Sequence, residues 1–104
     1  MRTLLHPTCE DLSLPDILYA LGDPLRLSIV GQLAVATEGI SCQHLVVDKV
    51  AKSTQSHHFK VLREAGLIRM TPQGRRVLVS LRREDLEVRF PGLLEAILQT
   101  YNRS

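Results

Sequence analysis

Apolar positions recur at helical spacing in the first third of the chain and predict two helices. The first begins at Pro15, a residue type favoured at the first helical position, and ends at Gly22. The second begins at Asp23-Pro24, which supply an N-cap and a first turn, and breaks off near residues 37–39. The apolar stripes of the two helices are Ile17, Leu18 and Leu21, and then Leu25, Ile29, Val30 and Leu33.

The middle of the chain predicts two further helices. A short one spans residues 41–47, with Leu45 facing the core, and a turn follows at residues 48–51. The next helix runs from Ser53 to Ala65, and its inward side chains are Phe59 and Leu62. Gly66 suits the left-handed position that commonly follows a helix.

The last third predicts a hairpin followed by a helix. Residues 77–81 alternate with the period of a strand, residues 67–71 form its partner, and residues 72–74 supply turn chemistry between them. Arg75 and Arg76 lie near the tip of this hairpin. After a helical turn that begins at residues 83–85, Pro91 can open a final helix. The apolar stripe of that helix is Leu93, Leu94, Ile97, Leu98 and Tyr101.

The predicted order of elements is therefore α-α-α-α-β-β-α, a mainly helical fold with a small β-hairpin. Two helices joined by a tight turn and followed by a hairpin are typical of a winged helix-turn-helix. In such a fold the second helix of the pair enters the major groove of DNA. We predict one such domain over residues 1–104, a length that suits a single domain.

Composition limits the setting in which the chain works. No stretch approaches the roughly 20 apolar residues that cross a bilayer, and residues 1–10 lack the apolar core of a signal peptide, so we expect a cytoplasmic protein. Cys9 and Cys42 are too few for a disulfide framework and are expected to be free thiols.

Charge is unevenly distributed although the net charge is only +2. Residues 49–83 contain nine Lys and Arg residues and one acid, Glu64, whereas both flanking segments are acidic. Such a basic block is typical of a face that binds a polyanion, and its alternative is a solvated cationic surface without a partner. Outside the predicted contacts, Arg26 is expected to pair with a carboxylate, and Arg82 and Arg83 either contact the DNA backbone or are solvated.

The start of the fourth predicted helix is polar over seven positions, residues 52–58. Hydroxyl, amide and basic side chains are the groups that read base edges and hold phosphates, and the arginines of the hairpin tip can reach a neighbouring minor groove. The predicted DNA-binding residues are Lys52, Ser53, Thr54, Gln55, Ser56, His57, His58, Lys60, Arg63, Arg75 and Arg76. Adjacent residues point about 100° apart on a helix, so one of the two histidines is expected to contact DNA and the other to pack.

Two stretches carry a resemblance to a known family. They read Ala20-Leu21-Gly22-Asp23-Pro24-Leu25-Arg26-Leu27 and Ser56-His57-His58-Phe59-Lys60-Val61-Leu62-Arg63-Glu64-Ala65-Gly66-Leu67-Ile68. In these stretches the chain resembles the ArsR/SmtB type of winged-helix repressor over roughly residues 15–83. The resemblance implies a bacterial homodimer built from the first and last helices. It also implies an operator with two-fold symmetry and repression that a signal relieves.

The dimer interface is predicted on these terminal helices. Because the chain is small and the stripe from Leu93 to Tyr101 is terminal, half of that stripe is expected to face a partner subunit; the alternative is that it belongs to the core of the chain itself. The predicted interface residues are Ile17, Leu18, Leu21, Leu94, Ile97, Leu98 and Tyr101.

The family's usual metal ligands are missing from the corresponding positions. Where many members place a Cys-x-Cys pair, this chain has Ser41 and Gln43 with Cys42 between them, and its last helix has Glu95 but no histidine. One thiol cannot supply the three or four ligands of such a site, so we expect no metal and no cofactor. A redox or metal sensor built from His6, Cys9 and Cys42 remains an alternative.

Three classes of function can be weighed on these residues. A sequence-specific DNA-binding regulator, acting as a repressor, accounts for the polar helix and the basic hairpin together. A winged-helix module that binds an acidic protein is the alternative. An enzyme is not expected, since the chain has no glycine-rich phosphate loop and no nucleophile motif, and Ser56-His57 are neighbours on one helix rather than a catalytic pair.

Overall fold

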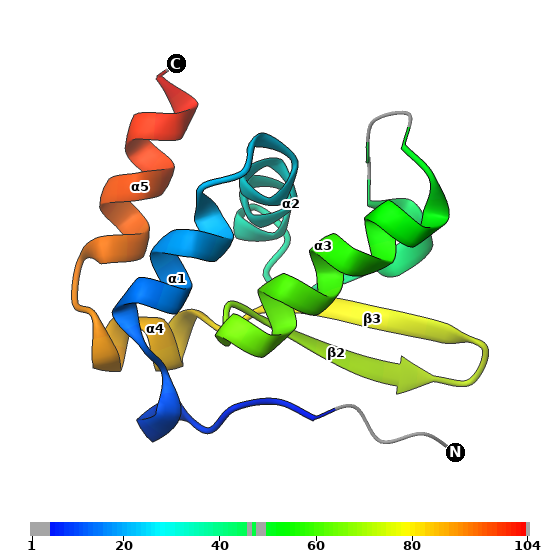
Figure 1. Ribbon diagram of the computed structural model, residues 1–104, viewed down its shortest axis with the longest axis horizontal. Helices are drawn as coiled ribbons and strands as arrows, with labels where there is room; N and C mark the ends of the chain where they lie inside the picture. Colours follow the sequence, from blue (N-terminus) through cyan, green and yellow to red (C-terminus); the bar gives the residue numbers. More distant parts are fainter. Residues whose placement is uncertain (1–4, 46, 48–49, 104) are drawn as a thin grey trace.

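The structure is a computed structural model that describes residues 5–45, 47 and 50–103. Its elements, shown in Figure 1, are η1 (Cys9–Asp11), α1 (Leu14–Leu21), α2 (Pro24–Ala34), β1 (Ile40–Ser41), η2 (Cys42–His44), α3 (Lys52–Ala65), β2 (Ile68–Gln73), β3 (Arg76–Leu81), α4 (Arg83–Arg89) and α5 (Leu93–Asn102). The predicted fold class, a mainly helical winged helix-turn-helix with a small β-hairpin, is confirmed.

Local capping explains the corner between α1 and α2. Asp23 is the N-cap of α2, as predicted, and its carboxylate accepts hydrogen bonds from the backbone N–H groups of Leu25 at 2.9 Å and Arg26 at 3.0 Å. Pro24 occupies the first turn, where its missing N–H costs nothing. The two helices therefore meet at a corner that two adjacent residues define.

The helix predicted over residues 41–47 is wrong in the described part of that range. Ile40 and Ser41 instead form strand β1, which pairs antiparallel with Val79 and Leu78 of β3, and only the single 3-10 turn η2 follows. A seven-residue helix is barely stable by itself, whereas pairing with β3 satisfies the backbone of this segment. Leu45 still reaches the core, as expected. Residues 46, 48 and 49 lie outside the described residues.

The hairpin β2–β3 is present and its turn is one position later than predicted. Pairing runs from Ile68 opposite Leu81 to Gln73 opposite Arg76, which leaves Gly74 and Arg75 as a two-residue turn. Gly74 has φ +64°, and such short hairpin turns require a positive φ that glycine adopts without strain. Pro72 is tolerated inside β2 because β2 is an edge strand in the order β1-β3-β2.

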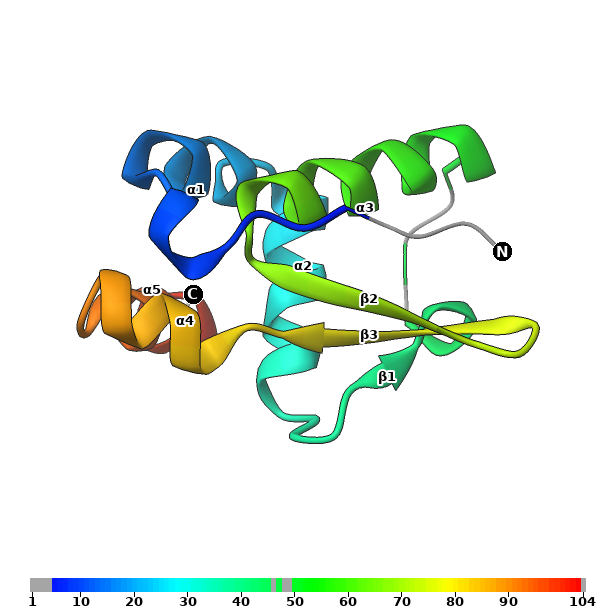
Figure 2. The same cartoon turned by 90° about the horizontal axis from the view of Figure 1, so that it is seen from below.

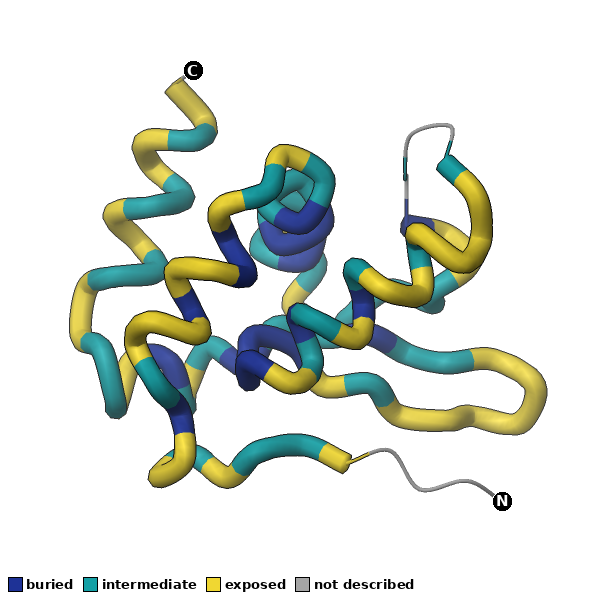
Figure 3. Tube along the Cα trace, viewed as in Figure 1, coloured by how far each residue is buried: buried dark blue, intermediate teal, exposed yellow. Residues whose placement is uncertain are grey.

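The turn of the hairpin and the helices α4 and α5 lie at opposite ends of the molecule. In Figure 2, α1 and α3 lie on one side of the three-stranded sheet, while α4 and α5 lie at the end opposite the hairpin turn. Figure 3 shows the buried residues in the middle of the molecule and exposed ones along the turn of the hairpin and the start of α3. The fully buried side chains include Ile17, Ile29, Leu33, Leu62, Leu67, Ile68, Val30 and Val79.

Candidate nucleic-acid interface

Helix α3 divides into a buried face and an exposed polar face. Phe59, Leu62 and Ala65 are its buried residues, at the spacing of one helical face. The helix ends at Gly66, whose φ of +90° is the left-handed value expected there. The exposed members of the predicted DNA-binding set on α3 are Lys52, Ser53, Thr54, Ser56, His57 and Lys60.

A groove joins the start of α3 to the hairpin, which we call the wing. Its volume is about 290 Å³, and it is lined by Lys52, Gln55 and Ser56 of α3 and by Arg75 and Arg76 of the wing. All five are predicted DNA-binding residues. The three on α3 and the two on the wing are about 20 positions apart in sequence, yet they line one concave surface. The fold therefore places the polar start of the helix beside the cationic turn of the wing.

Both wing arginines are exposed. Among the described residues, the side chain of neither arginine has a hydrogen-bond or ion-pair partner. A guanidinium has five N–H donors and stays charged at any physiological pH. Unpaired arginine side chains at the edge of this groove are suited to binding phosphate oxygens. Gln55 is half-buried, with Nε2 donating to the carbonyl oxygen of Val50 at 3.3 Å.

Sequence reasoning missed part of this groove. Ser41, Cys42 and Gln43 also line it, from β1 and η2. They reach the groove because β1 pairs with β3, which is a contact between distant segments. The local pattern of residues 41–47 gave a helix and so carried no signal for it.

His58 does not face outward as predicted. Its side chain is 12% exposed, and its Nδ1 lies 3.1 Å from Nη1 of Arg26. Residue 58 lies four positions before Leu62 and is therefore on the border of the buried face of α3, since residues four apart share one face of a helix. The neighbouring His57, about 100° away around the helix, is exposed.

Arg63 is also less exposed than predicted. It is half-buried, and its Nε is enclosed without a hydrogen-bond partner among the described residues. Arg63 lies four positions after the buried Phe59, which places it on the border of the same face. Only part of the predicted set on α3 is thus available on the outer surface.

Arg26 is structural, as expected, but the hydrogen bonds of its guanidinium do not include the expected carboxylate. The side chain is 7% exposed and donates to the backbone carbonyls of Ala20 at 2.7 Å and Tyr19 at 3.3 Å. Asp23 lies nearby. Hydrogen bonds from the backbone N–H groups of Arg26 and Leu25, together with the positive charge of Arg26, outweigh partial burial and hold the pKa of its carboxyl below the usual value.

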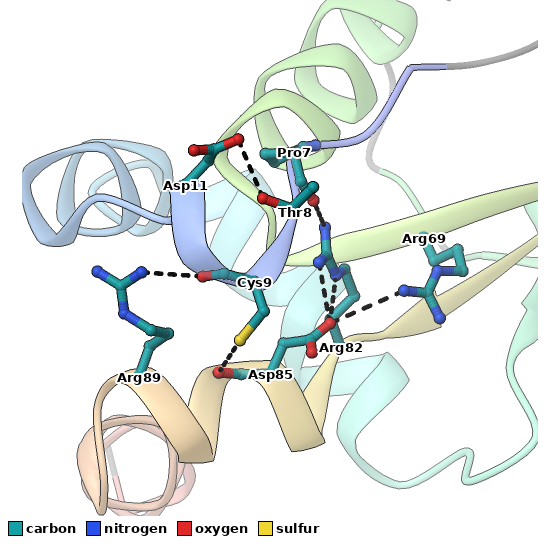
Figure 4. Close-up of polar contacts among 8 residues, drawn as sticks. All are labelled: Pro7, Thr8, Cys9, Asp11, Arg69, Arg82, Asp85 and Arg89. Atoms are coloured by element: carbon teal, nitrogen blue, oxygen red, sulfur yellow. Dashed lines mark hydrogen bonds and ion pairs between the residues drawn. The ribbon is translucent and has the colours of Figure 1, made fainter.

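Arg82 and Arg83 of the basic block serve the fold, so the expectations that they contact the DNA backbone or are solvated were wrong. Arg82 is 6% exposed; its Nε donates to Asp85 at 2.9 Å and its Nη1 to the carbonyl oxygen of Pro7 at 2.8 Å, as Figure 4 shows. Arg83 donates to the carbonyls of Leu33 and Ala34, near the C-terminal end of α2. Arg69 lies 3.8 Å from Asp85. Charge counted along the sequence therefore overstates the charge available to a ligand.

The alternative sensor of His6, Cys9 and Cys42 has no common site. Cys9 is in η1, where its Sγ donates to the carbonyl oxygen of Asp85 at 3.7 Å (Figure 4), whereas Cys42 lines the groove beside α3. Partial burial raises the pKa of both thiols, and at Cys9 the carboxylate of Asp85 adds to this effect. In the described part of the chain no three His, Cys, Asp or Glu side chains are grouped as metal ligands.

The predicted dimer residues fall into two groups. Ile17 and Leu21 are buried within the chain, where with Leu94 and Ile97 they line a small apolar gap of about 10 Å³ between α1 and the α4–α5 segment. The assignment of Ile17 and Leu21 to an interface was wrong, because a small domain uses its most apolar positions for its own core. Leu18 is 50% exposed, and Leu94, Ile97, Leu98 and Tyr101 are half-buried.

Within the described residues, no helix has the length and apolar character needed to cross a membrane. No protein-family model matches the chain.

Individual proteins do match the sequence. The chain is 39% identical over 90 residues to the uncharacterized HTH-type transcriptional regulator YceK of Bacillus subtilis, covering 85% of this chain and 89% of that protein. It is 36% identical over 61 residues to an uncharacterized HTH-type transcriptional regulator of Methanocaldococcus jannaschii, covering 57% of this chain and 66% of the relative.

Solved structures give the same answer for the fold. A crystal structure of an ArsR family transcriptional regulator aligns with a TM-score of 0.65 and 26% identity, covering 88% of this chain and 97% of that chain. The transcriptional repressor BigR of Xylella fastidiosa aligns with a TM-score of 0.63 and 22% identity over 85% of each chain, which supports the fold alone. All these proteins are described as regulators, in agreement with the prediction that the chain is not an enzyme. The chain belongs to the winged helix-turn-helix transcriptional regulators of the ArsR type.

Proposed function

We propose that this chain is a sequence-specific repressor that binds double-stranded DNA as a homodimer on a two-fold symmetric operator. The observation that carries the proposal is the groove shared by Lys52, Gln55 and Ser56 of α3 and by Arg75 and Arg76 of the wing. A helix of this exposed polar character fits the major groove, and the wing then lies against the adjacent backbone.

The residues at the start of α3 and on the wing take different roles in this proposal. Thr54, Gln55, Ser56 and His57 supply hydroxyl, amide and imidazole groups that can reach base edges from the start of α3. Arg75 and Arg76 bind phosphates or enter the minor groove, which orients the protein without reading sequence directly. Lys52 and Lys60 add phosphate contacts along the helix.

The dimer is proposed to form through the outer faces of α1 and α5. Leu14 and Leu18 on α1 are exposed, and Leu98 on α5 is half-buried, so apolar surface remains on these terminal helices after the chain has folded. A two-fold axis there would present two copies of α3 to successive major grooves, about 34 Å apart. The whole chain, residues 1–104, acts as one DNA-binding domain in this proposal, and we place it in the cytoplasm with no cofactor.

Selection of bound sequences from a random duplex pool tests this function. We expect enrichment of an inverted repeat, and affinity for it that falls steeply with salt because bound phosphates release their counterions. Gln55→Ala is expected to reduce discrimination between the selected duplex and a scrambled one, whereas Arg75→Ala weakens both about equally. Weak, salt-insensitive binding to every duplex would refute the proposal and favour the protein-binding module.

A further inference from the structure

We propose that His58 is a positioning residue for DNA recognition, held by the buried Arg26 so that the rotation of α3 about its axis is fixed. This role rests on the proposed function, in which α3 reads the duplex. It differs from the direct DNA contact that the sequence predicted for His58, because the imidazole faces α1 and α2 rather than solvent.

Arg26 links three helices through one nearly buried guanidinium. The residue is on the first turn of α2, its Nε and Nη2 donate to the carbonyls of Ala20 and Tyr19 on α1, and its Nη1 donates to Nδ1 of His58 on α3 at 3.1 Å. The two carbonyls belong to the last turn of α1, where backbone oxygens lack the regular helical partner four residues on; the oxygen of Tyr19 also accepts from the N–H of Gly22 at 3.1 Å. The guanidinium lies 5.4 Å from the ring centre of Tyr19, which covers it further.

The chemistry of this contact fixes the state of the imidazole. A guanidinium has only donors, so Nδ1 of His58 must accept the hydrogen bond and the proton of the neutral ring must be on Nε2. The Asp23 carboxylate, 3.9 Å from Nδ1, is beyond hydrogen-bond distance and itself caps α2. Arg26 is thus the group that holds His58 from the α2 side.

Few other contacts hold the early part of α3. Its buried residues, Phe59, Leu62 and Ala65, all belong to the second half of the helix. The contact at His58 lies at the junction with the exposed first half, next to His57. A rotation of α3 here would turn Lys52 and Ser56 away from the groove that they share with the wing. Through Tyr19 and Ala20 the same contact relates α3 to α1, the helix proposed to lie at the dimer interface.

Two substitutions of one residue separate a positioning role from simple packing. In His58→Asn the side-chain oxygen takes the place of Nδ1 and can still accept from Arg26, whereas His58→Leu fills similar space without an acceptor. We expect His58→Leu to lose about tenfold in discrimination between the selected duplex and its scrambled control, the scale of one charge-assisted hydrogen bond. His58→Asn should stay within about threefold of the wild type.

Further variants keep the test independent of folding defects. Arg26→Lys keeps the positive charge but lacks the planar fork, so we expect a loss similar to that of His58→Leu. His44→Leu makes the same replacement at an exposed histidine on η2 and should leave discrimination unchanged. Circular dichroism of each variant establishes that the helices are retained before binding is measured.

Nitrogen-15 NMR of the free protein supplies a readout that needs no DNA. We expect His58 in the Nε2–H form, and a loss of that preference in Arg26→Met, which fills similar space without a donor. The positioning role is overturned if His58 carries its proton on Nδ1, or if a folded His58→Leu discriminates as well as the wild type. If the wild type itself prefers no duplex while His58 shows the Nε2–H form, the DNA-reading function fails and the Arg26–His58 contact stands as part of the fold only.

Discussion

The two ends of this molecule use the same residue type in opposite ways. At the wing, Arg75 and Arg76 are exposed, and within the described residues their guanidinium groups have no hydrogen-bond or ion-pair partner. At the opposite end, Arg82 and Arg89 donate to the backbone carbonyls of the N-terminal segment, at Pro7 and Cys9 among others (Figure 4). Arginine alone therefore says little about function, and the partners around it decide.

Because the two ends differ in this way, a small chain can be stable and still bind a charged ligand. At the end formed by η1, α1 and α4 the charge of Arg82 is paired within the chain, with Asp85 accepting from Arg82 at 2.9 Å. The wing leaves its charges unsatisfied and so retains their full capacity for a ligand. One end is therefore expected to contribute stability and the other to contribute binding, and substitutions at the two ends should have different effects.

The largest effect is expected from placing one methyl group at two glycines. Gly66 has φ +90°, and an added Cβ would collide with the side chain of Leu12, so Gly66→Ala should lower the free energy of unfolding by about 3 kcal/mol. Gly74, at the wing turn, has φ +64° but open space around it, so Gly74→Ala should cost only about 1 kcal/mol of backbone strain. Denaturant unfolding of both variants measures the difference, and equal losses would contradict it.

Adjacent residues of α1 give the next contrast. Ile17 is buried, and Ile17→Ala should lower the free energy of unfolding by about 3 kcal/mol through lost burial and a residual cavity. Leu18→Glu changes a side chain that is 50% exposed, so it should barely alter the stability of the folded chain while shifting a dimer toward monomer. Sedimentation equilibrium and chemical unfolding separate the two effects. A Leu18→Glu protein that stays dimeric would remove α1 from the interface.

Arginines at the two ends should respond to alanine in different assays. Arg82→Ala removes bonds to Asp85 and Pro7 and should cost about 2 kcal/mol of unfolding free energy. Arg76→Ala should cost less than about 0.5 kcal/mol. It should instead reduce the salt dependence of duplex binding by about one phosphate contact. Arg103→Ala, on an exposed residue after α5, is the control expected to change neither quantity.

Asp23, at the corner between the two ends, should show the smallest effect and a dependence on pH. Asp23→Ala removes the N-cap of α2, at a cost of about 1 kcal/mol at neutral pH. Because folding lowers the pKa of this carboxyl below its ordinary value of 3.8, its stabilising contribution is complete above that value and is lost as the pH falls through the lower, folded-state pKa. The stability gap between wild type and Asp23→Ala should therefore narrow in acid, and a gap that widens would be inconsistent with the assigned bonds.

Local signals in the sequence predicted the elements whose boundaries are set locally. The cap at Asp23, the glycine at 66 and the apolar spacing of α3 each act within a few residues, and the structure confirms them. Residues 41–47 were assigned to a helix because their strand partner, β3, lies almost 40 positions away and leaves no local trace.

For the candidate site, too, only the features that are local in the sequence could be predicted. The polar start of α3 and the arginine pair of the wing are visible in the sequence, and their shared groove follows from the fold. The inward turn of His58 and the internal partners of Arg82 could not be predicted, because each depends on a residue from another element: Arg26 in one case and Pro7 in the other.

Amide NMR of the nitrogen-15-labelled protein during titration with the selected duplex tests the central claim most directly. If α3 and the wing face DNA, the largest shifts will fall on residues 52–60 and 73–77, while the amides of α4 and the outer face of α1 change little. The largest shifts on α1, α4 or α5, with the wing unperturbed, would contradict the account.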